Sequence, residues 1–276
     1  MAHAQSGPLS AQDIRSQLES ECSKASDFWR TIDVVSETGS TNADLLVQAA
    51  NGTDRAVLLA EQQTAGRGRH DRTWVTRPGS GLIMSVLFRP VGVEPARLGW
   101  IPLLTGVAVA RALREAAGVD ARLKWPNDIL VGERKIAGIL AEVASQPGTL
   151  GVVVGFGINV CLAENELPVP TATSLMIEGA PSVDRNVLAA AALKELATRL
   201  DNWMALGGRD PEVAAEYVTW CVTLGQQVRV SLPGDESLYG RAERIDASGR
   251  LVVRPDSGGE VVSVSAGDVT HVRAAE

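Results

Sequence analysis

The sequence predicts an α+β protein with one large domain and a small all-β domain at its C-terminal end. Its 276 residues exceed the usual size of a single domain, which favours a large core and a smaller one. Apolar strand patterns alternate with helical ones along most of the chain, whereas short alternating strands fill the part after Gly225. The predicted segments are an N-terminal extension (1–30), a large domain (31–223) and a small domain (224–276).

Capping signals and apolar periodicity predict the elements of the first half. Ser10, with Asp13 three residues later, is a plausible capping box for a short helix. Residues 31–46 predict a strand, a turn of Gly, Ser and Thr, and a helix that begins near Asn42. Two more buried strands and a long apolar helix follow, over residues 55–63, 81–90 and 97–117.

The second half contains three apolar runs, then two helices, then the small domain. Gly132 and Glu133 predict a hairpin between the first two runs. Asp184 is expected to cap a helix through Trp203, and Asp210 caps another. The apolar runs are 121–131, 134–144 and 150–160, and the short strands of the predicted β-barrel are 226–233, 237–246, 249–255 and 260–269.

Charge and composition exclude several classes of protein. The formal net charge is −7, so no basic field over the whole protein draws it to nucleic acid or an anionic membrane. Three cysteines without CxxC spacing argue against a disulfide framework and a zinc cluster, and favour a reducing cytoplasm. The N-terminus lacks a signal-peptide pattern, and the longest apolar stretch ends at Arg111, well short of a membrane span.

Residues 64–74, TAGRGRHDRTW, concentrate positive charge in this acidic chain. Glycines let a backbone close over a ligand, and guanidinium groups make bidentate contacts to phosphate or carboxylate. A solvated loop or a nucleic-acid patch would have the same composition. The residues concerned are Gly66, Arg67, Gly68, Arg69, His70 and Arg72.

A second segment, KWPNDILVGERKIAGILAE over residues 124–142, places a lysine within an apolar run. Lys135 would pay a heavy desolvation cost there unless it met an anion. Next to ATP, such a lysine can neutralise charge that develops on the α-phosphate. The alternative is a hairpin lysine that points to solvent. Asp128 could hold magnesium, orient Lys135, or be a turn residue after Pro126.

Two shorter motifs add polar groups and close backbone approaches. ETGSTN, residues 37–42, can form a site for an anion or a polar ring at a helix start, or be a simple N-cap. GFGINV, residues 155–160, has two glycines in an apolar strand and ends at Asn159, which suggests close approach of a ligand or another backbone. Fingerprints of Rossmann proteins, P-loop enzymes, serine hydrolases and zinc peptidases are missing.

Taken in order, these motifs resemble those of the biotin protein ligases. The motifs are GSTN, AEQQTAGRGRHDRTW, KWPNDILVGERKIAGILAE, GFGINV and ATSL at residues 172–175, and a C-terminal β-module follows them. The resemblance implies the catalytic fold shared by biotin synthetases and class II aminoacyl-tRNA synthetases, with an SH3-like C-terminal domain. It also implies that ATP and Mg²⁺ convert biotin to biotinyl-5′-AMP, and that biotin then passes to a lysine of a biotin carboxyl carrier domain of an acyl-CoA or pyruvate carboxylase.

The resemblance also implies roles for individual residues. Lys135, Arg67 and Arg69 would act in catalysis, and Asp128 is the candidate magnesium ligand. Residues expected to bind biotin are Ser40, Thr41, Asn42, Gln63, Gly66, Arg67 and Gly138. Residues expected to bind ATP or the adenylate are Arg69, Arg72, Trp74, Asn127, Asp128, Lys135 and Asn159.

One departure concerns the basic loop, where Asp71 replaces the glycine of the family pattern GRGRxGR. A carboxylate there could weaken phosphate attraction or brace Arg69 or Arg72. Some family members carry an N-terminal DNA-binding domain, but only about 30 residues precede the predicted core here, so we expect no DNA binding and favour a monomer. Two alternatives are a lipoate or other acyl-protein ligase of the same superfamily, and a non-enzymatic regulator that binds biotinyl-AMP.

Overall fold

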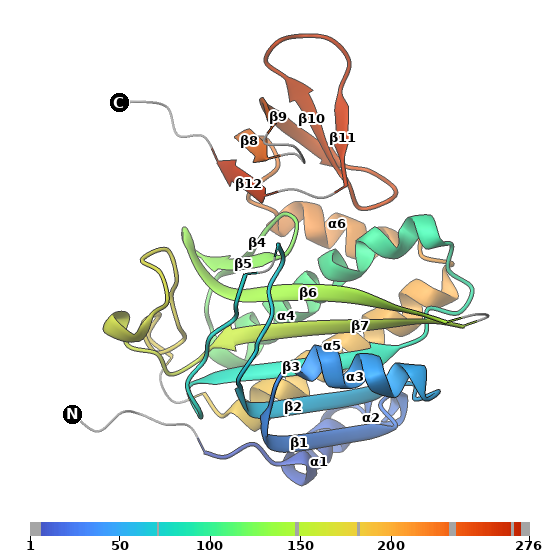
Figure 1. Cartoon of the computed structure of the whole chain (residues 1–276), viewed down its shortest axis with the longest axis vertical. Helices are drawn as coiled ribbons and strands as arrows, with labels where there is room; N and C mark the ends of the chain where they lie inside the picture. The colour runs from blue at the N-terminus through green and yellow to red at the C-terminus, as the bar shows by residue number, and fades with distance from the viewer. Residues whose placement is uncertain are drawn as a thin grey trace.

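The computed structural model describes residues 7–70, 72–146, 149–180, 183–231, 236–265 and 268–271. Asp71 lies outside these ranges. A large domain of helices packed on a sheet carries a small β-domain at one end (Figure 1). The seven strands of the large sheet have the order β1-β2-β3-β7-β6-β5-β4. Of the strand pairs described in this sheet, β1–β2 is parallel and the others are antiparallel. The predicted α+β architecture is therefore confirmed.

The strands and helices of the large domain follow the predicted order along the chain. The strands are β1 (Thr31–Thr38), β2 (Ala56–Gln63), β3 (Gly81–Phe88), β4 (Ala121–Lys124), β5 (Asp128–Val131), β6 (Arg134–Gln146) and β7 (Thr149–Asn159). The helices are α1 (Ala11–Glu21), α2 (Ser23–Phe28), α3 (Thr41–Ala50), α4 (Ile101–Ala117), α5 (Arg185–Ala205) and α6 (Pro211–Trp220), with short 3₁₀ turns η1 (Pro95–Trp100) and η2 (Glu164–Glu166).

Several predicted helix starts are confirmed by hydrogen bonds. The Ser10 hydroxyl accepts a hydrogen bond from the Asp13 backbone N–H at 3.2 Å. Asp184 and Asp210 accept from backbone N–H groups in the first turns of α5 and α6. These side chains satisfy donors that an α-helix leaves unpaired at its start. α1 and α2 pack on α5, and α1 also contacts β1. The domain boundaries near residues 30 and 223 stay predictions.

The first apolar run differs from the prediction, because it contains two strands. A turn with a cis Trp125–Pro126 peptide separates β4 from β5. Proline has no N–H to donate to a sheet ladder, so strand pairing stops there. The predicted hairpin at Gly132, which has a φ of 58°, joins β5 to β6 as expected. The predicted helix 97–117 likewise divides into η1 and α4.

Helices cover the two faces of the sheet unequally. α1, α2, α4 and α5 pack on one face, where Val57 and Leu59 of β2 point into the main core. On the other face α3 packs over Ala56 and Leu58, and it is the one helix on that face in the part of the chain that the structure describes. One 10-residue helix cannot cover seven strands, so part of that face remains for a binding site. Figure 1 shows α3 on the near side of the sheet and α4 and α5 behind it.

The helical stretch Pro95–Ala117 is long and apolar enough to cross a membrane. However, 67% of its most apolar 18-residue segment is buried inside the protein. Along α4, Leu104, Val107 and Leu113 have no exposed surface. The apolar character of this helix is therefore explained by packing against α5 and the sheet.

The small domain is a five-stranded antiparallel sheet with the order β11-β10-β9-β8-β12. Its strands are β8 (Gln227–Ser231), β9 (Ser237–Ile245), β10 (Leu251–Pro255), β11 (Val262–Val264) and β12 (Asp268–His271). The last predicted strand, 260–269, corresponds to β11 and the start of β12. The buried indole of Trp125 donates to the Gly249 carbonyl at 3.1 Å, which attaches the β9–β10 turn to the large domain.

Candidate functional site

A cavity of about 520 Å³ opens on the α3 face of the sheet, beside the N-terminal end of that helix. The strand register explains where the space comes from. Ser85 pairs with Gly155, and Gly157 pairs with Gly138, so four small residues lie in two adjacent rows on one face. All four line the cavity. Small side chains on a central sheet leave room above the backbone for a flat group.

One end of the cavity is lined by uncharged polar side chains that bond to one another, with Arg67 above them. The Thr41 backbone N–H and hydroxyl both donate to Gln63 Oε1, at 2.8 and 3.0 Å. Ser85 lies 2.7 Å from the Thr41 hydroxyl and donates to Asn42 Oδ1 at 2.6 Å. Ser40 caps α3 through the Ala43 N–H. These contacts hold the predicted GSTN residues in place, and buried polar groups paired in this way form a rigid set of donors and acceptors.

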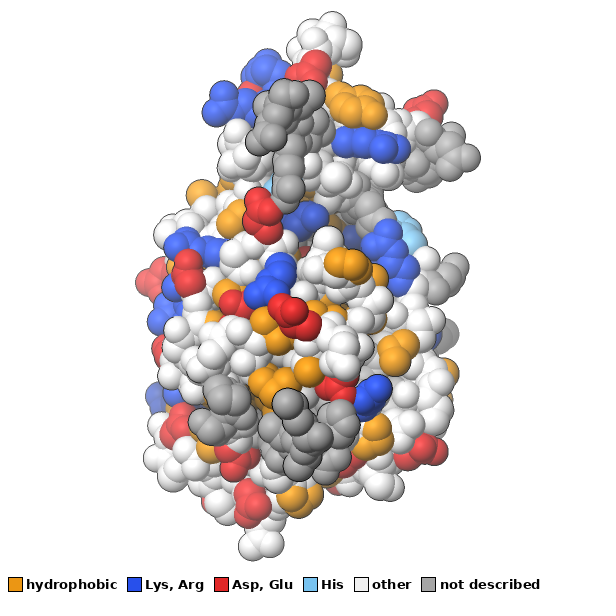
Figure 2. All heavy atoms as spheres, turned by 90° about the vertical axis from the view of Figure 1, so that its left-hand side faces the viewer, with side chains coloured by type: hydrophobic (Ala, Val, Ile, Leu, Met, Phe, Trp, Pro, Cys, Tyr) orange, Lys and Arg blue, Asp and Glu red, His pale blue; other side chains and the backbone are white. Residues whose placement is uncertain are grey.

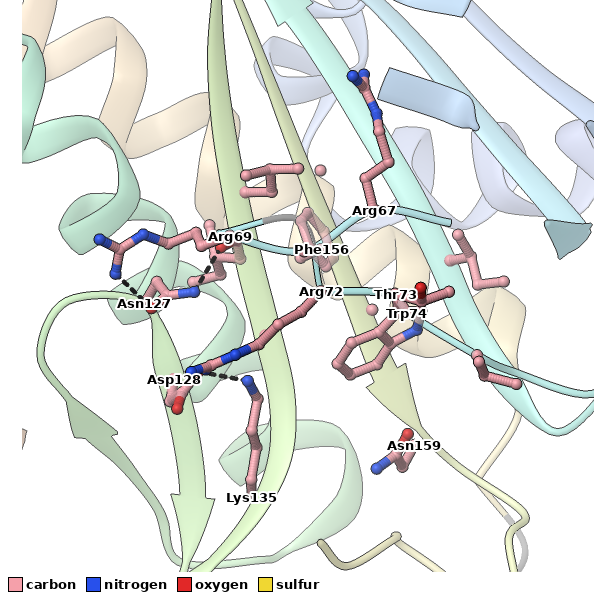
Figure 3. A pocket seen from close by; sticks show the side chains of 18 of the residues that line it. Arg67, Arg69, Arg72, Thr73, Trp74, Asn127, Asp128, Lys135, Phe156 and Asn159 are labelled. Carbon is pink, nitrogen blue, oxygen red and sulfur yellow. Dashed lines mark hydrogen bonds and ion pairs between the residues drawn. The ribbon is translucent and has the colours of Figure 1, made fainter. Parts of the chain in front are cut away.

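The opposite end of the cavity is basic. Lys135 Nζ forms an ion pair with Asp128 Oδ1 at 2.5 Å, so the lysine in the apolar run has a carboxylate partner. Arg69 donates to Asn127 Oδ1 at 3.1 Å. Figure 3 shows the side chain of Arg72 reaching toward Asp128 from the basic loop above. Residues distant in sequence thus meet around one space.

The charges that line the cavity favour an anionic ligand. Five lining residues are basic and one is acidic, which is opposite to the balance of the whole chain. Low-dielectric walls lined by one sign of charge attract the opposite sign. On the face that Figure 2 shows below the small domain, basic and acidic side chains are mixed. The charged lining residues are Arg67, Arg69, Arg72, Lys124, Lys135 and Asp128.

The basic loop folds as a small hairpin over the cavity. The Gly68 N–H donates to the Arg72 carbonyl at 2.6 Å, and the Trp74 N–H donates to the Gly66 carbonyl at 2.9 Å. A Cβ at position 66 would lie 2.4 Å from the Trp74 oxygen and 2.7 Å from Gln63 Nε2. Glycine is therefore required at position 66 by close backbone approach, although Gly66 itself is not among the lining residues.

Trp74 lies on the glycine rows of the sheet. A Cβ added to Gly157 would come within 2.4 Å of the indole ring, and one added to Gly138 would lie 3.2 Å from it. The indole Nε1 is buried and has no hydrogen-bond partner among the residues that the structure describes. Since buried N–H groups are nearly always satisfied, this donor is available to an acceptor on a bound ligand.

Two predicted site residues have contacts that their expected roles did not include. Arg67 Nη2 donates to Glu142 Oε2 at 3.0 Å, and Figure 3 shows its side chain pointing away from Lys135 and Asp128. Asn159 is buried and donates to the Thr173 carbonyl at 2.9 Å, which ties β7 to the ATSL segment. Both residues line the cavity, and their predicted ligand contacts stay predictions.

Several lining residues were missed in the motifs. Ser85 joins Thr41 to Asn42, and a serine in the apolar strand GLIMSVLF was the available signal. Val269 and Thr270 bring the small domain to the cavity, and no local pattern indicates this long-range contact. Burial lowers the pKa of the adjacent His271, and the charge of Lys124 acts in the same direction.

Comparisons with known proteins agree over nearly the whole chain. Residues 32–159 match the biotin/lipoate A/B protein ligase family, and residues 223–272 match the biotin protein ligase C terminal domain. The biotin–[acetyl-CoA-carboxylase] ligase of Mycobacterium tuberculosis is 45% identical over 96% of this chain and 97% of that protein. A bifunctional ligase/repressor of Bacillus subtilis is 32% identical, over 91% of this chain and 76% of that protein.

Solved structures give the same result. The biotin protein ligase of Aquifex aeolicus in complex with biotin and ATP superposes with a TM-score of 0.74 at 26% identity, and the match covers 89% of this chain and 100% of that chain. The ligase of Leishmania major in complex with biotinyl-5-AMP gives a TM-score of 0.60, also at 26% identity, over 86% and 99% of the two chains.

Proposed function

This chain belongs to the biotin protein ligases, and we propose that its cavity activates biotin with ATP and supplies the biotinyl group to a lysine of a carrier protein. The observation that carries this proposal is the division of the cavity into an uncharged polar end, a floor of glycines and a basic end. Biotin has a matching order of groups, because its ureido ring, its aliphatic chain and its carboxylate follow one another.

The polar end suits the ureido ring. Gln63, Thr41 and Ser85 offer donors and acceptors held by one another, and a site built to hydrogen-bond a polar ring rejects analogues that lack it. Lipoate carries a dithiolane in place of that ring and would leave these groups unpaired. We therefore favour biotin over lipoate as the acid.

Adenylation would take place at the basic end. The biotin carboxylate attacks the α-phosphorus of ATP, a P–O bond to the β-phosphate breaks, and pyrophosphate leaves. Lys135 is positioned by Asp128 to offset the negative charge that develops on the α-phosphate. Arg69, held by Asn127, supplies a second cation. Trp74 and the basic loop would exclude water from the mixed anhydride.

A magnesium ion fits this end as a companion of ATP. No group of three or more acidic, histidine or cysteine side chains capable of holding a metal occurs among the described residues. Mg²⁺ needs only one or two carboxylates when phosphates complete its coordination, and Asp128 offers one. When bound, Mg²⁺ would neutralise charge on the ATP phosphates.

In the second step the ε-amine of the acceptor lysine attacks the acyl carbon, and AMP leaves. We propose a biotin carboxyl carrier domain of an acyl-CoA carboxylase as the acceptor. The net charge of −7 supports a partner set without nucleic acid or membrane. A cytoplasmic monomer is the form we propose.

Pyrophosphate release from ATP and Mg²⁺ tests the first step. Biotin should give pyrophosphate in an amount that matches the amount of enzyme, because the mixed anhydride stays shielded without an acceptor, whereas lipoate and the buffer control should give none. Release with lipoate alone would assign the chain to lipoate activation, and no release with either acid would refute the adenylation chemistry.

Substitution of Gly157 by alanine should raise the KM for biotin by about fivefold or more, because overpacking costs about 1–3 kcal/mol. The added methyl would overlap the Trp74 indole. Gly151→Ala is the matched control on the same strand, since its Cβ would make only ordinary contacts from 3.5 Å. Equal KM values for the two variants would contradict a biotin site on the glycine floor next to Trp74.

A further inference from the structure

Glu142 is a charged residue on β6, on the same face of the sheet as the floor of the cavity. It follows Gly138 and Leu140 at alternate positions of β6, so the three side chains share one face of the sheet. Its register partner is Val153, which packs under α3. Glu142 therefore lies next to the polar end of the cavity without being among its lining residues.

One oxygen of Glu142 joins the floor of the cavity to the basic loop. Oε2 accepts from Asn42 Nδ2 at 2.8 Å and from Arg67 Nη2 at 3.0 Å. Asn42 is 4% exposed, and its amide is fixed on three sides. Nδ2 also donates to the Leu140 carbonyl at 3.1 Å, and Oδ1 accepts from Ser85. The position of Glu142, and through it that of Arg67, is therefore set by a buried amide.

The contacts form an unbroken path from the predicted biotin end to the loop. Neighbouring residues of the path have polar atoms 2.6 to 3.0 Å apart, and the two hydroxyls, with one hydrogen each, donate along two of the three contacts between Gln63 and Asn42. Arg69 has a different anchor, because it is bonded to Asn127 at the basic end. The loop is thus held at both ends of the cavity. The residues of the path are Gln63, Thr41, Ser85, Asn42, Glu142 and Arg67.

We propose that Glu142 is a positioning residue that holds Arg67 against the polar end, so that biotin binding there and closure of the basic loop favour each other. This inference rests on the proposed function, since it takes biotin as the ligand of that end. Coupling of this kind is reciprocal: biotin that orders Thr41 and Asn42 steadies Glu142 and the loop, and a loop held by Glu142 slows the loss of biotin.

Replacing Glu142 with glutamine tests the effect of its charge while keeping its shape. In Glu142→Gln the side chain keeps its size and one oxygen, but the charge-assisted bond to Arg67 becomes a weaker neutral one. The Glu142 side chain is 24% exposed and that of Arg67 is 43% exposed, so the pair is worth at most about fivefold in an equilibrium constant. The expected effects are therefore severalfold.

Trypsin provides a readout that does not depend on catalysis. We would follow cleavage after Arg69 and Arg72, which do not take part in the altered contact. Wild type should be cut slowly, and more slowly with saturating biotin. Glu142→Gln should be cut about three- to fivefold faster and should lose most of the biotin protection.

The matched control is Glu243→Gln in the small domain. Glu243 pairs with Arg254 at 2.5 Å and is 27% exposed, so the same charge is removed from a similar environment away from the loop. Its cleavage and its KM for biotin should equal those of wild type. Identical loop cleavage and KM for the two variants would overturn the proposal.

Kinetics complete the test. Glu142→Gln should raise the KM for biotin about three- to fivefold with kcat changed less, and should add nothing in an Arg67→Ala background. An equal effect in that background would also overturn the proposal. If Glu142→Gln lowers the melting temperature, Arg67→Ala tests the same contact from the loop side by cleavage after Arg69 and Arg72. A wild type that does not activate biotin would refute the proposed function, whereas trypsin cleavage without biotin still tests the anchor.

Discussion

Replacing Lys135 with alanine should reduce biotin-dependent pyrophosphate release by about a hundred- to a thousandfold, with much less change in the KM for biotin. Lys135 is the cation next to Asp128 at the basic end of the cavity. Loss of a preorganised group that stabilises developing charge typically costs this much in kcat. Biotin contacts at the polar end remain, so binding should persist while the chemical step fails.

Steady-state kinetics with saturating ATP, biotin and carrier domain measure this effect. Lys194→Ala is the control. Lys194 lies on α5, on the other side of the sheet, where it pairs with Glu21 of α1 at 2.9 Å. That variant should keep the wild-type kcat. A Lys135→Ala enzyme with a kcat near that of wild type would show that charge stabilisation comes from elsewhere in the cavity.

Replacing Glu61 with alanine should lower the free energy of unfolding by about 3 kcal/mol, because it strands a buried cation. Arg185 is 1% exposed, and its Nη1 and Nη2 lie 2.7 and 3.1 Å from the two Glu61 oxygens. The same guanidinium donates to the Gly81 and Gly7 carbonyls. Glu61 is itself 21% exposed, which places the loss near the lower end of the usual range of about 3–5 kcal/mol.

Urea unfolding of wild type and of Glu61→Ala measures this difference in the free energy of unfolding. Glu243→Ala should lose less than about 1 kcal/mol, since it breaks a solvent-exposed pair. An equal loss of unfolding free energy in Glu61→Ala and Glu243→Ala would contradict a larger contribution from the buried pair. Glu61 lies two residues before Gln63. We therefore also expect the folded Glu61→Ala variant to bind biotin more weakly than wild type.

The sequence motifs predicted which segments meet at the site, but not which partner each of their side chains bonds. The ordered motifs were sufficient because each one combines a strand or helix end with polar residues, and local patterns carry that information. Arg67 and Arg69 are two residues apart, yet one bonds to Glu142 and the other to Asn127. These anchors come from β6 and the β4–β5 turn, and no local pattern fixes such long-range pairings.

The same reasoning explains the errors in the elements. The split of residues 121–131 into β4 and β5 followed from Pro126, whose missing N–H interrupts strand pairing. Ser85 was hidden in an apolar strand, and its role became visible only when the register brought Gly155 opposite it. Gly155 is small because a Cβ there would lie 2.1 Å from Asn42 Oδ1, which is a tertiary constraint.

Intact-mass spectrometry of a purified biotin carboxyl carrier domain is the most direct measurement of what this chain does. With the chain, ATP, Mg²⁺ and biotin, the carrier should gain the mass of one biotinyl group, and a carrier with arginine in place of its acceptor lysine should gain none. Omitting biotin, or using Lys135→Ala for the same short time, should abolish the gain. An unmodified carrier in the complete reaction, with adenylation of biotin still observed, would contradict the assignment of this chain as a ligase.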